Sequence, residues 1–285
     1  MERIFVFLRS PGAATTVLLG ATIIALIVAN SPLATQYMSL VNLPLGPLTA
    51  MEWVNDALMA IFFLFVGLEV KRELVSGELN TNAKRIMPGI AALFGVIVPA
   101  IIFYLIAGSN DVYVHGWAIP TATDIAFAIG VITALGSRVP NSMKVFLTAL
   151  AVIDDLIAII VIAIFYAASI NLFYLVASVI VTGLLIYCNR TGYVRSLSYI
   201  ILGVILWYCI LRSGLHATMA GVILAMTIPE RGKIGKKYVR PMQHWEHYLS
   251  NWVSFVIVPI FAFFNAGVNL DGFGMADLSH PVVLG

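Results

Sequence analysis

Apolar residues fill most of the sequence in long runs, and short polar segments separate these runs. About 20 consecutive apolar residues suffice for one helical crossing of a bilayer, and nine runs approach or exceed that length. By residue number they are 12–30, 52–70, 86–107, 113–136, 142–168, 172–189, 196–211, 213–228 and 248–267. The two runs within 196–228 are short and closely joined, so they are also consistent with tilted or partly re-entrant helices. The pattern predicts an all-α polytopic membrane protein with about nine transmembrane helices.

Basic residues lie almost entirely on one side of this arrangement. If the spans alternate in direction, 15 of the 16 lysines and arginines fall on the same side, and Arg212 alone falls on the other. Because cytoplasmic loops are enriched in lysine and arginine, we predict a cytoplasmic N-terminus and an outward-facing end after the ninth span.

Composition supports a membrane protein and excludes a large soluble domain. Hydrophobic residues make up 61% of the 285 residues and charged residues 11%, whereas soluble domains carry about 25% charged residues. The basic residues are spread over the loops, which does not indicate a nucleic-acid surface. We expect residues 1–285 to form one integral membrane domain.

Two adjacent carboxylates, Asp154 and Asp155, interrupt the fifth apolar run. One carboxylate at mid-membrane costs about 2.5–3.5 kcal/mol on insertion scales, so such a pair indicates a site reached by water, a cation or a proton. Neighbours on a helix point about 100° apart. We therefore expect one aspartate to face a water-filled cavity and bind the cation, and the other to meet a basic partner or a proton. Two carboxylates that stay permanently neutralised inside a helical bundle are the alternative.

A predicted helix break in the fourth run would add further oxygen ligands to this site. Pro120 disfavours helix at the preceding residue, and Thr121 and Thr123 are good caps for a helix that restarts after it. Asp124 would then lie near a helix N-terminus, where negative charge is stabilised. Interrupted helices of this kind form substrate sites in transporters. An ordinary proline kink with a satisfied aspartate is the alternative.

Together these residues could bind a small hard cation, which prefers oxygen ligands. Asp155, Asp154 and the Thr123 hydroxyl would supply such ligands, with freed carbonyls near Pro120. Coupled carboxylates titrate as a set, so protons and Na⁺ or Li⁺ would compete for the same oxygens. This competition is sufficient to exchange one ion for the other.

A charged cluster ends the second run. Glu69, Arg72 and Glu73 are three or four residues apart and share a helix face. They form either a solvated helix end with ion pairs or a funnel mouth that responds to pH. Candidates for the opposite wall lie near the ninth span, namely Arg240, His244, Glu246 and His247.

Five motifs in the chain resemble the NhaA-type bacterial sodium/proton antiporters. They are NDALMAIFFLFVGLEVKREL, WAIPTATDIAFAIGV, LTALAVIDDLIAII, SGLHATMAGVI and PIFAFFNAGV. The resemblance implies that Asp155 is the main Na⁺/Li⁺ and proton carboxylate and Asp154 its coupled neighbour. It also implies that Asp124 and Thr123 belong to the broken-helix crossing. The residues that match the family's cytoplasmic pH-sensing cluster are Glu69, Arg72, Glu73, Glu246 and His247.

The chain also departs from the family pattern at three places. Ser250 replaces a further histidine of the pH-sensing cluster. The segment of residues 31–50 is shorter than the family's dimerising hairpin. Whether this chain forms the homodimer that the family implies is therefore left undecided by the sequence. The family continues for three more helices, with a lysine that pairs with the residue matching Asp154. We therefore expect a C-terminally shortened member that holds one of the family's two inverted repeats, in spans three to five.

The predicted function is secondary active transport rather than enzymatic catalysis. We expect exchange of Na⁺ or Li⁺ for H⁺ across the bacterial inner membrane, regulated by pH and, as the family implies, electrogenic. No cofactor and no nucleic-acid partner are expected. A sodium-coupled symporter and an inactive antiporter fragment remain alternatives. An intramembrane aspartyl protease fits poorly, because its two aspartates lie on separate helices and its Gly-x-Gly-Asp motif does not occur here.

Overall fold

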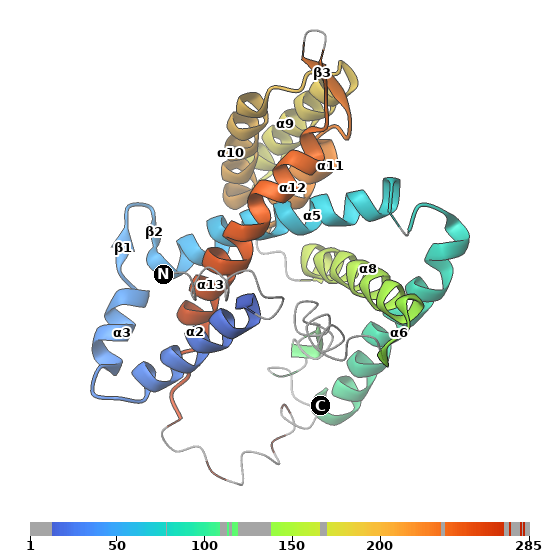
Figure 1. Cartoon of the computed structure of the whole chain (residues 1–285). Helices are drawn as coiled ribbons and strands as arrows, with labels where there is room; N and C mark the ends of the chain where they lie inside the picture. Colours follow the sequence, from blue (N-terminus) through green and yellow to red (C-terminus); the bar gives the residue numbers. More distant parts are fainter. Residues whose placement is uncertain are drawn as a thin grey trace, which may run out of the picture. The chain divides into compact units, whose positions relative to one another are not determined.

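The computed structural model describes residues 13–77, 79–108, 113, 116–118, 138–165, 170–234, 237–270, 274, 280 and 282. These residues form helices and two short β-hairpins (Figure 1). Their contacts divide the chain into two compact units. The first holds Met1–Arg72 and Ala163–Asn269, and the second Glu73–Ile162 and Leu270–Gly285.

The N-terminal half of the first unit begins with a bent helix pair and ends with a long helix. In chain order its elements are α2 (Ala13–Ala29), α3 (Ala34–Val41), β1 (Pro44–Leu45), β2 (Leu48–Thr49), α4 (Ala50–Glu52), the π-helical η1 (Trp53–Leu58) and α5 (Met59–Val75). The axes of α2 and α3 differ by 118°. A capping box of Thr49 and Glu52 starts α4, which continues through η1 into α5. The capping box explains why the helix of the second apolar run, Ala50–Val75, begins after Thr49.

Three helices, a hairpin and a final long helix follow in the same unit. They are α9 (Leu172–Arg190), α10 (Ser196–Ser213), α11 (Met219–Thr227), β3 (Gly232–Ile234), β4 (Lys237–Val239), α12 (Pro241–Trp252), the π-helical η4 (Val253–Ile257) and α13 (Val258–Asn265). The Asn171 side chain caps the start of α9, and Gly214, at φ 87°, ends α10. A left-handed residue at this position is a common helix stop, and glycine adopts it without a steric penalty.

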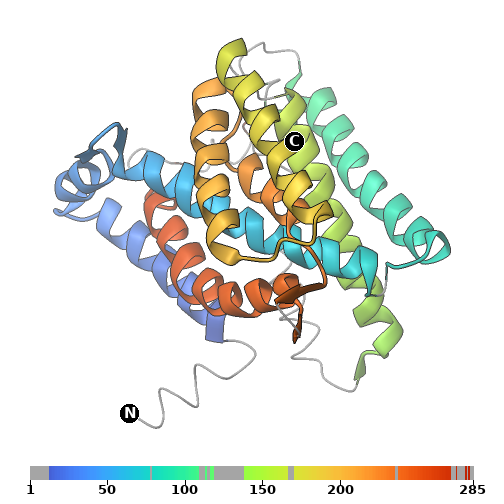
Figure 2. The same ribbon diagram turned by 90° about the horizontal axis from the view of Figure 1, so that it is seen from above.

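Hydrogen bonds join segments of the first unit that lie far apart in sequence. Helices α2 and α13 lie side by side (Figure 2). The Tyr37 hydroxyl donates to the Phe263 carbonyl at 2.7 Å. The Asn265 amide nitrogen donates to the Asn55 side-chain oxygen at 2.8 Å, which ties the end of α13 to η1.

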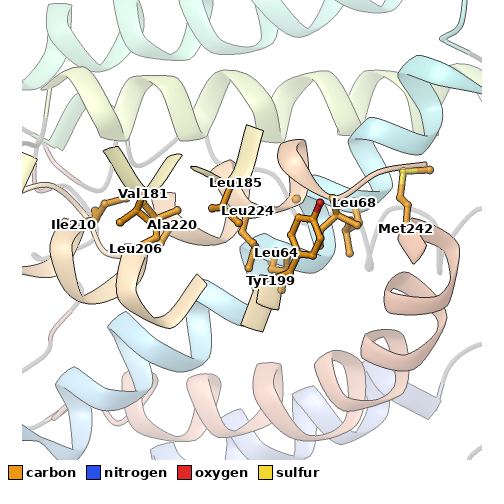
Figure 3. Packing of buried hydrophobic residues seen from close by; sticks show 12 residues of the cluster. Leu64, Leu68, Val181, Leu185, Tyr199, Leu206, Ile210, Ala220, Leu224 and Met242 are labelled. Atoms are coloured by element: carbon orange, nitrogen blue, oxygen red, sulfur yellow. The ribbon is translucent and has the colours of Figure 1, made fainter. Parts of the chain in front are cut away.

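The main hydrophobic cluster lies between α5, α9, α10, α11 and α12 (Figure 3). Its members are Leu64, Leu68, Val181, Leu185, Tyr199, Leu206, Ile210, Ala220, Leu224, Ala225, Ile228 and Met242. Two glycines let α5 and α11 approach closely. A Cβ on Gly67 would lie 2.7 Å from the Ala225 Cβ, and one on Gly221 would lie 2.0 Å from the Ala60 carbonyl oxygen. Small residues are common where membrane helices meet, because they let the backbones approach.

The second unit contains α6 (Asn82–Ala107) and α8 (Asn141–Phe165), the latter extending just past the unit's limit. The Arg85 guanidinium donates to the Leu79 carbonyl and, at 2.9 Å, to the Leu74 carbonyl. It thereby fixes the turn that leads into α6. A Cβ on Gly89 of α6 would lie 4.0 Å from the Ile153 side chain of α8. Helix α6 therefore passes beside the turn that carries the two aspartates.

Five helices of the described residues are long and apolar enough to cross a membrane, and the bent pair α2–α3 makes a sixth if it is one span. The five are Ala50–Val75, Asn82–Ala107, Leu172–Arg190, Ser196–Ser213 and Pro241–Asn265. Large apolar side chains on them are exposed, with Leu105 at 77% and Phe173 at 75%. Such extensive exposed apolar faces are unusual for a soluble protein and are expected for helices in lipid.

Some of the predicted spans agree with these helices and others do not. The fifth predicted run coincides with the 25 residues of α8, whereas the fourth, 113–136, lies almost entirely outside the described residues. The eighth run, 213–228, contains only the nine residues of α11. At 1.5 Å per residue α11 rises about 14 Å, less than half of the roughly 30 Å hydrocarbon core. It is therefore too short to cross by itself, whereas α10 in the same region is long enough to span.

Candidate functional site

Helix α8 carries the aspartate pair within an apolar stretch of 25 residues. Asp154 is 3% exposed, which makes it one of the few buried ionisable side chains among the described residues. Asp155 follows it on the same helix, although its side chain lies outside the described residues. A buried carboxylate is stable only with a hydrogen-bonding partner, a proton or a cation. Asp154 makes an interaction within the structure.

The predicted helix break, with Pro120, Thr123 and Asp124, lies outside the described residues. The proposed meeting of Thr123 and Asp124 with Asp155 therefore stays a prediction.

The charged cluster of α5 lines a pocket against α12. The pocket has a volume of about 400 Å³ and lies within the first unit. Its lining residues are Phe65, Glu69, Arg72, Gln243, Glu246, His247 and Ser250. On α5 these positions are three or four residues apart. On α12, Glu246 and His247 each lie three or four residues from Gln243 and Ser250, so each set lies along one side of its helix. Four of the five residues predicted for pH sensing thus meet in one pocket, namely Glu69, Arg72, Glu246 and His247.

An ion pair connects the two walls of this pocket. The Arg72 guanidinium donates to Glu246 Oε1, and the side chains are 36% and 12% exposed, respectively. Glu69 also lines the pocket, so Arg72 has a second carboxylate close by. The arrangement holds acidic, basic and imidazole groups together in a space that water can enter, as a site sensitive to pH requires.

Glu73 is the fifth predicted residue, and it does not line the pocket. A Cβ added to Gly77 would lie 2.2 Å from Glu73 Oε2, so the Glu73 carboxylate lies over the turn that ends α5. On the opposite wall, Arg240 and His244 are likewise absent from the lining, and Arg240 is within 3.4 Å of the Gln243 side-chain oxygen. Sequence reasoning missed Phe65 and Gln243, although both lie at helical spacing from residues that it singled out.

Lys71 anchors the pocket helix to α11. Its ammonium group donates to the carbonyls of Ala225, Met226 and Ile228, with a distance of 2.7 Å to Met226. The Asn189 amide donates to the Thr227 carbonyl at 2.6 Å. The last carbonyls of a helix lack partners within the helix, so these donors satisfy the end of α11. The Lys71 bonds also fix the end of α5 that carries Glu69 and Arg72.

Comparison with known proteins identifies the family of the chain. The sequence profile described as "Na+/H+ antiporter 1" matches residues 6–285. An Na(+)/H(+) antiporter NhaA from Mesorhizobium japonicum is 51% identical over 282 residues, which cover 98% of this chain and 71% of the relative. Antiporters NhaA from Rhizobium etli and Caulobacter vibrioides are 47% and 48% identical, over 98% of this chain and 72% and 68% of their own lengths.

Long apolar helices with exposed apolar faces define a polytopic membrane protein, and the matched profile makes it a transporter rather than an enzyme. The family match is more specific. This chain belongs to the NhaA family of Na⁺/H⁺ antiporters of bacterial membranes.

Proposed function

We propose that this chain exchanges Na⁺, or Li⁺, for protons by competition at Asp155 and Asp154. The family supports Na⁺/H⁺ antiport, and the assignment of these residues is our own. In the proposed site Asp155 binds the cation. Asp154 is its coupled neighbour, and Thr123 and Asp124 add oxygen ligands at the helix break.

The observation that carries this proposal is the burial of Asp154, at 3% exposure, next to Asp155 within the apolar helix α8. When a cation binds from one side, a protonated carboxyl loses its proton to water and the carboxylate coordinates the cation. After access changes to the other side, a proton displaces the cation. Each state keeps the buried charge compensated, which is the condition for a carboxylate in this environment.

Two or three coupled carboxylates allow more than one proton to leave for each cation that binds. We therefore propose electrogenic exchange across the inner membrane, with the N-terminus on the cytoplasmic side as the basic residues predict. We propose that the pocket of Glu69, Arg72, Glu246 and His247 regulates this exchange with pH.

Antiport in inside-out membrane vesicles tests the proposal. A pH-sensitive dye reports proton movement when Na⁺ or Li⁺ is added to vesicles that contain the 285-residue chain. We expect Asp155→Asn to abolish the response, because an amide cannot release a proton or carry the compensating charge. Asp154→Asn should reduce it less. Asp56→Asn is the matched control, since it removes a carboxylate from another apolar helix, and it should keep the response.

Two results would contradict the proposal. Wild-type exchange by Asp155→Asn would remove Asp155 from the site. Proton movement that requires an organic substrate together with Na⁺ would instead identify a symporter. Equal amounts of each variant in the membrane, measured by immunoblotting, ensure that lost activity reflects chemistry rather than insertion.

A further inference from the structure

The hairpin between α11 and α12 carries the densest positive charge of the chain. Strands β3 and β4 pair antiparallel, with Gly232 opposite Val239 and Lys233 opposite Tyr238. Residues 229–240 contain five lysines and arginines and one acidic residue, Glu230. Glu230 pairs with Arg231 at 3.5 Å. The hairpin thus retains a net positive charge of about four after this pair is counted.

The hairpin is held beside the ends of two apolar helices. A Cβ on Gly232 would lie 2.1 Å from a methyl group of Val194, so β3 packs directly on the connection between α9 and α10. Trp245 Nε1 of α12 lies 3.2 Å from the hydroxyl oxygen of Ser196, the first residue of α10. Figure 1 shows β3 at the end of the group formed by α9, α10 and α11. Since α9 and α10 are long enough to span a membrane, we expect the hairpin at their connection to lie near the membrane surface.

An exposed aromatic ring accompanies the basic residues. Tyr238 is 77% exposed, and the Lys233 ammonium lies 4.6 Å from the centre of its ring. Tyrosine is enriched at membrane–water interfaces, where its ring meets the acyl boundary and its hydroxyl the headgroups. The connection between α9 and α10 adds two further basic residues, Arg190 and Arg195.

We propose that the β3–β4 hairpin binds the headgroups of anionic phospholipids at the membrane surface. Clusters of four to eight basic residues directly beside a transmembrane helix attract anionic lipids, at about 1 kcal/mol for each lysine or arginine. The hairpin meets this description, and its base is fixed by Val194 and Ser196. Tyr238 and Lys233 are placed for contact with the same lipid layer.

Native mass spectrometry of the purified full chain tests this proposal. The chain is equilibrated with equal amounts of phosphatidylglycerol and phosphatidylcholine, and the ratio of the two bound lipids is measured. We expect the triple variant Arg231→Gln, Lys233→Gln, Lys237→Gln to lose the preference for phosphatidylglycerol. About 1 kcal/mol for each basic residue corresponds to about fivefold for each and on the order of a hundredfold for three.

A matched control separates the hairpin from total charge. The triple variant Lys84→Gln, Arg138→Gln, Lys144→Gln removes three charges on the same predicted side but outside the hairpin, and it should keep the preference. An equal loss in both triple variants would overturn the proposal. The variant Arg231→Lys, Lys233→Arg, Lys237→Arg keeps the charge and should bind phosphatidylglycerol as the unmodified chain does.

Three further results would also overturn the proposal, and all use the unmodified chain, so they do not depend on the folding of a variant. The first is a lipid preference that does not fall with rising salt, because exposed charges are screened. The second is displacement of phosphatidylglycerol by an equal concentration of soluble glycerol phosphate. The third is binding of polyuridylate without any preference for phosphatidylglycerol, which would indicate a nucleic-acid ligand.

Discussion

Ser250 lines the pocket of α5 and α12 at the position where the family resemblance places a histidine. A hydroxyl group does not titrate between pH 5 and 8, whereas an imidazole does. We expect Ser250→His to add a titrating group beside Glu246 and His247. The pH dependence of exchange should then become steeper between about pH 6 and 8. Dye-reported antiport at several pH values in vesicles measures this change.

The control for this substitution is Ser250→Gln, which adds a polar side chain of similar size that does not titrate. If the glutamine variant changes the pH profile as much as the histidine variant does, side-chain volume rather than titration is responsible. A histidine variant that keeps the wild-type profile would mean that the pocket does not regulate exchange.

The ion pair of Arg72 and Glu246 can be tested by a double-mutant cycle. Arg72→Gln removes the guanidinium that donates to Glu246, whose side chain is 12% exposed, and Glu246→Gln removes the negative charge of the pair. Each single change should destabilise the protein and alter the pH profile of exchange. The double variant should be closer to wild type than the two single effects predict, with a coupling of about 1 kcal/mol in thermal unfolding. Strictly additive effects would show that the pair is energetically unimportant.

At this scale, the sequence was informative where residues share a helix face. The spacing of Glu69 with Arg72 predicted that these two side chains would share a helix face. Glu246 and His247 are consecutive residues, so their meeting in one pocket did not follow from helical spacing. The spacing could not predict which faces of α5 and α12 meet. Glu73 shares the spacing but lies over the Gly77 turn, a local contact that helical periodicity does not contain.

At the scale of elements, the approach of α5 and α11 depends on Gly221. A Cβ there would lie 2.0 Å from the Ala60 carbonyl oxygen, and this atom belongs to helix backbone that cannot move aside cheaply. We expect Gly221→Ala to destabilise the protein by about 1–3 kcal/mol, the usual cost of overpacking. Size-exclusion chromatography after heating in detergent measures the loss.

Gly183→Ala on α9 is the matched control, because no atom lies within 4 Å of the added Cβ. Alanine is favoured over glycine in a helix by up to about 1 kcal/mol, so this variant should be as stable as wild type or more so. Equal stability of the two alanine variants would contradict the close approach of α5 and α11.

Long apolar runs predicted most helices of the described chain, because a crossing of the bilayer requires a minimum length of apolar residues. Hydropathy did not predict the interruption within 213–228. There Gly214 ends α10, and α11 begins only at Met219. Hydropathy also gave no sign of β3 and β4. Their pairing depends on a turn and on contact with Val194, and neither changes the apolar pattern.

At the scale of the whole molecule, transport requires residues from separate parts of the chain, and the sequence contributes more here than the structure does. Five motifs, among them the one around Asp154 and Asp155, predicted the family, and the resemblance implied the ions. The contribution of Thr123 and Asp124 stays a prediction, since the break lies outside the described residues. The family relation is confirmed over residues 6–285.

Competition between Na⁺ and protons has a consequence for the complete transport cycle. If one proton must leave the site for each Na⁺ that binds, the apparent KM for Na⁺ rises about tenfold for each unit of pH decrease once protons occupy the site, and about a hundredfold if two protons leave. Raising the pH lowers the KM until the carboxylates are fully ionised. The maximal rate at saturating Na⁺ should change much less, because enough cation displaces the protons.

Antiport measured over a range of Na⁺ concentrations, between roughly pH 6 and 8.5, separates this effect from regulation. Competition at Asp154 and Asp155 changes KM, whereas a pocket that switches the protein between active and inactive states changes the maximal rate. The Arg72→Gln variant provides the comparison. In this variant the pH dependence of the maximal rate should change, whereas the pH dependence of the KM for Na⁺ should stay the same. A KM that stays constant across this range would contradict competition for the aspartates, even if the chain exchanges the two ions.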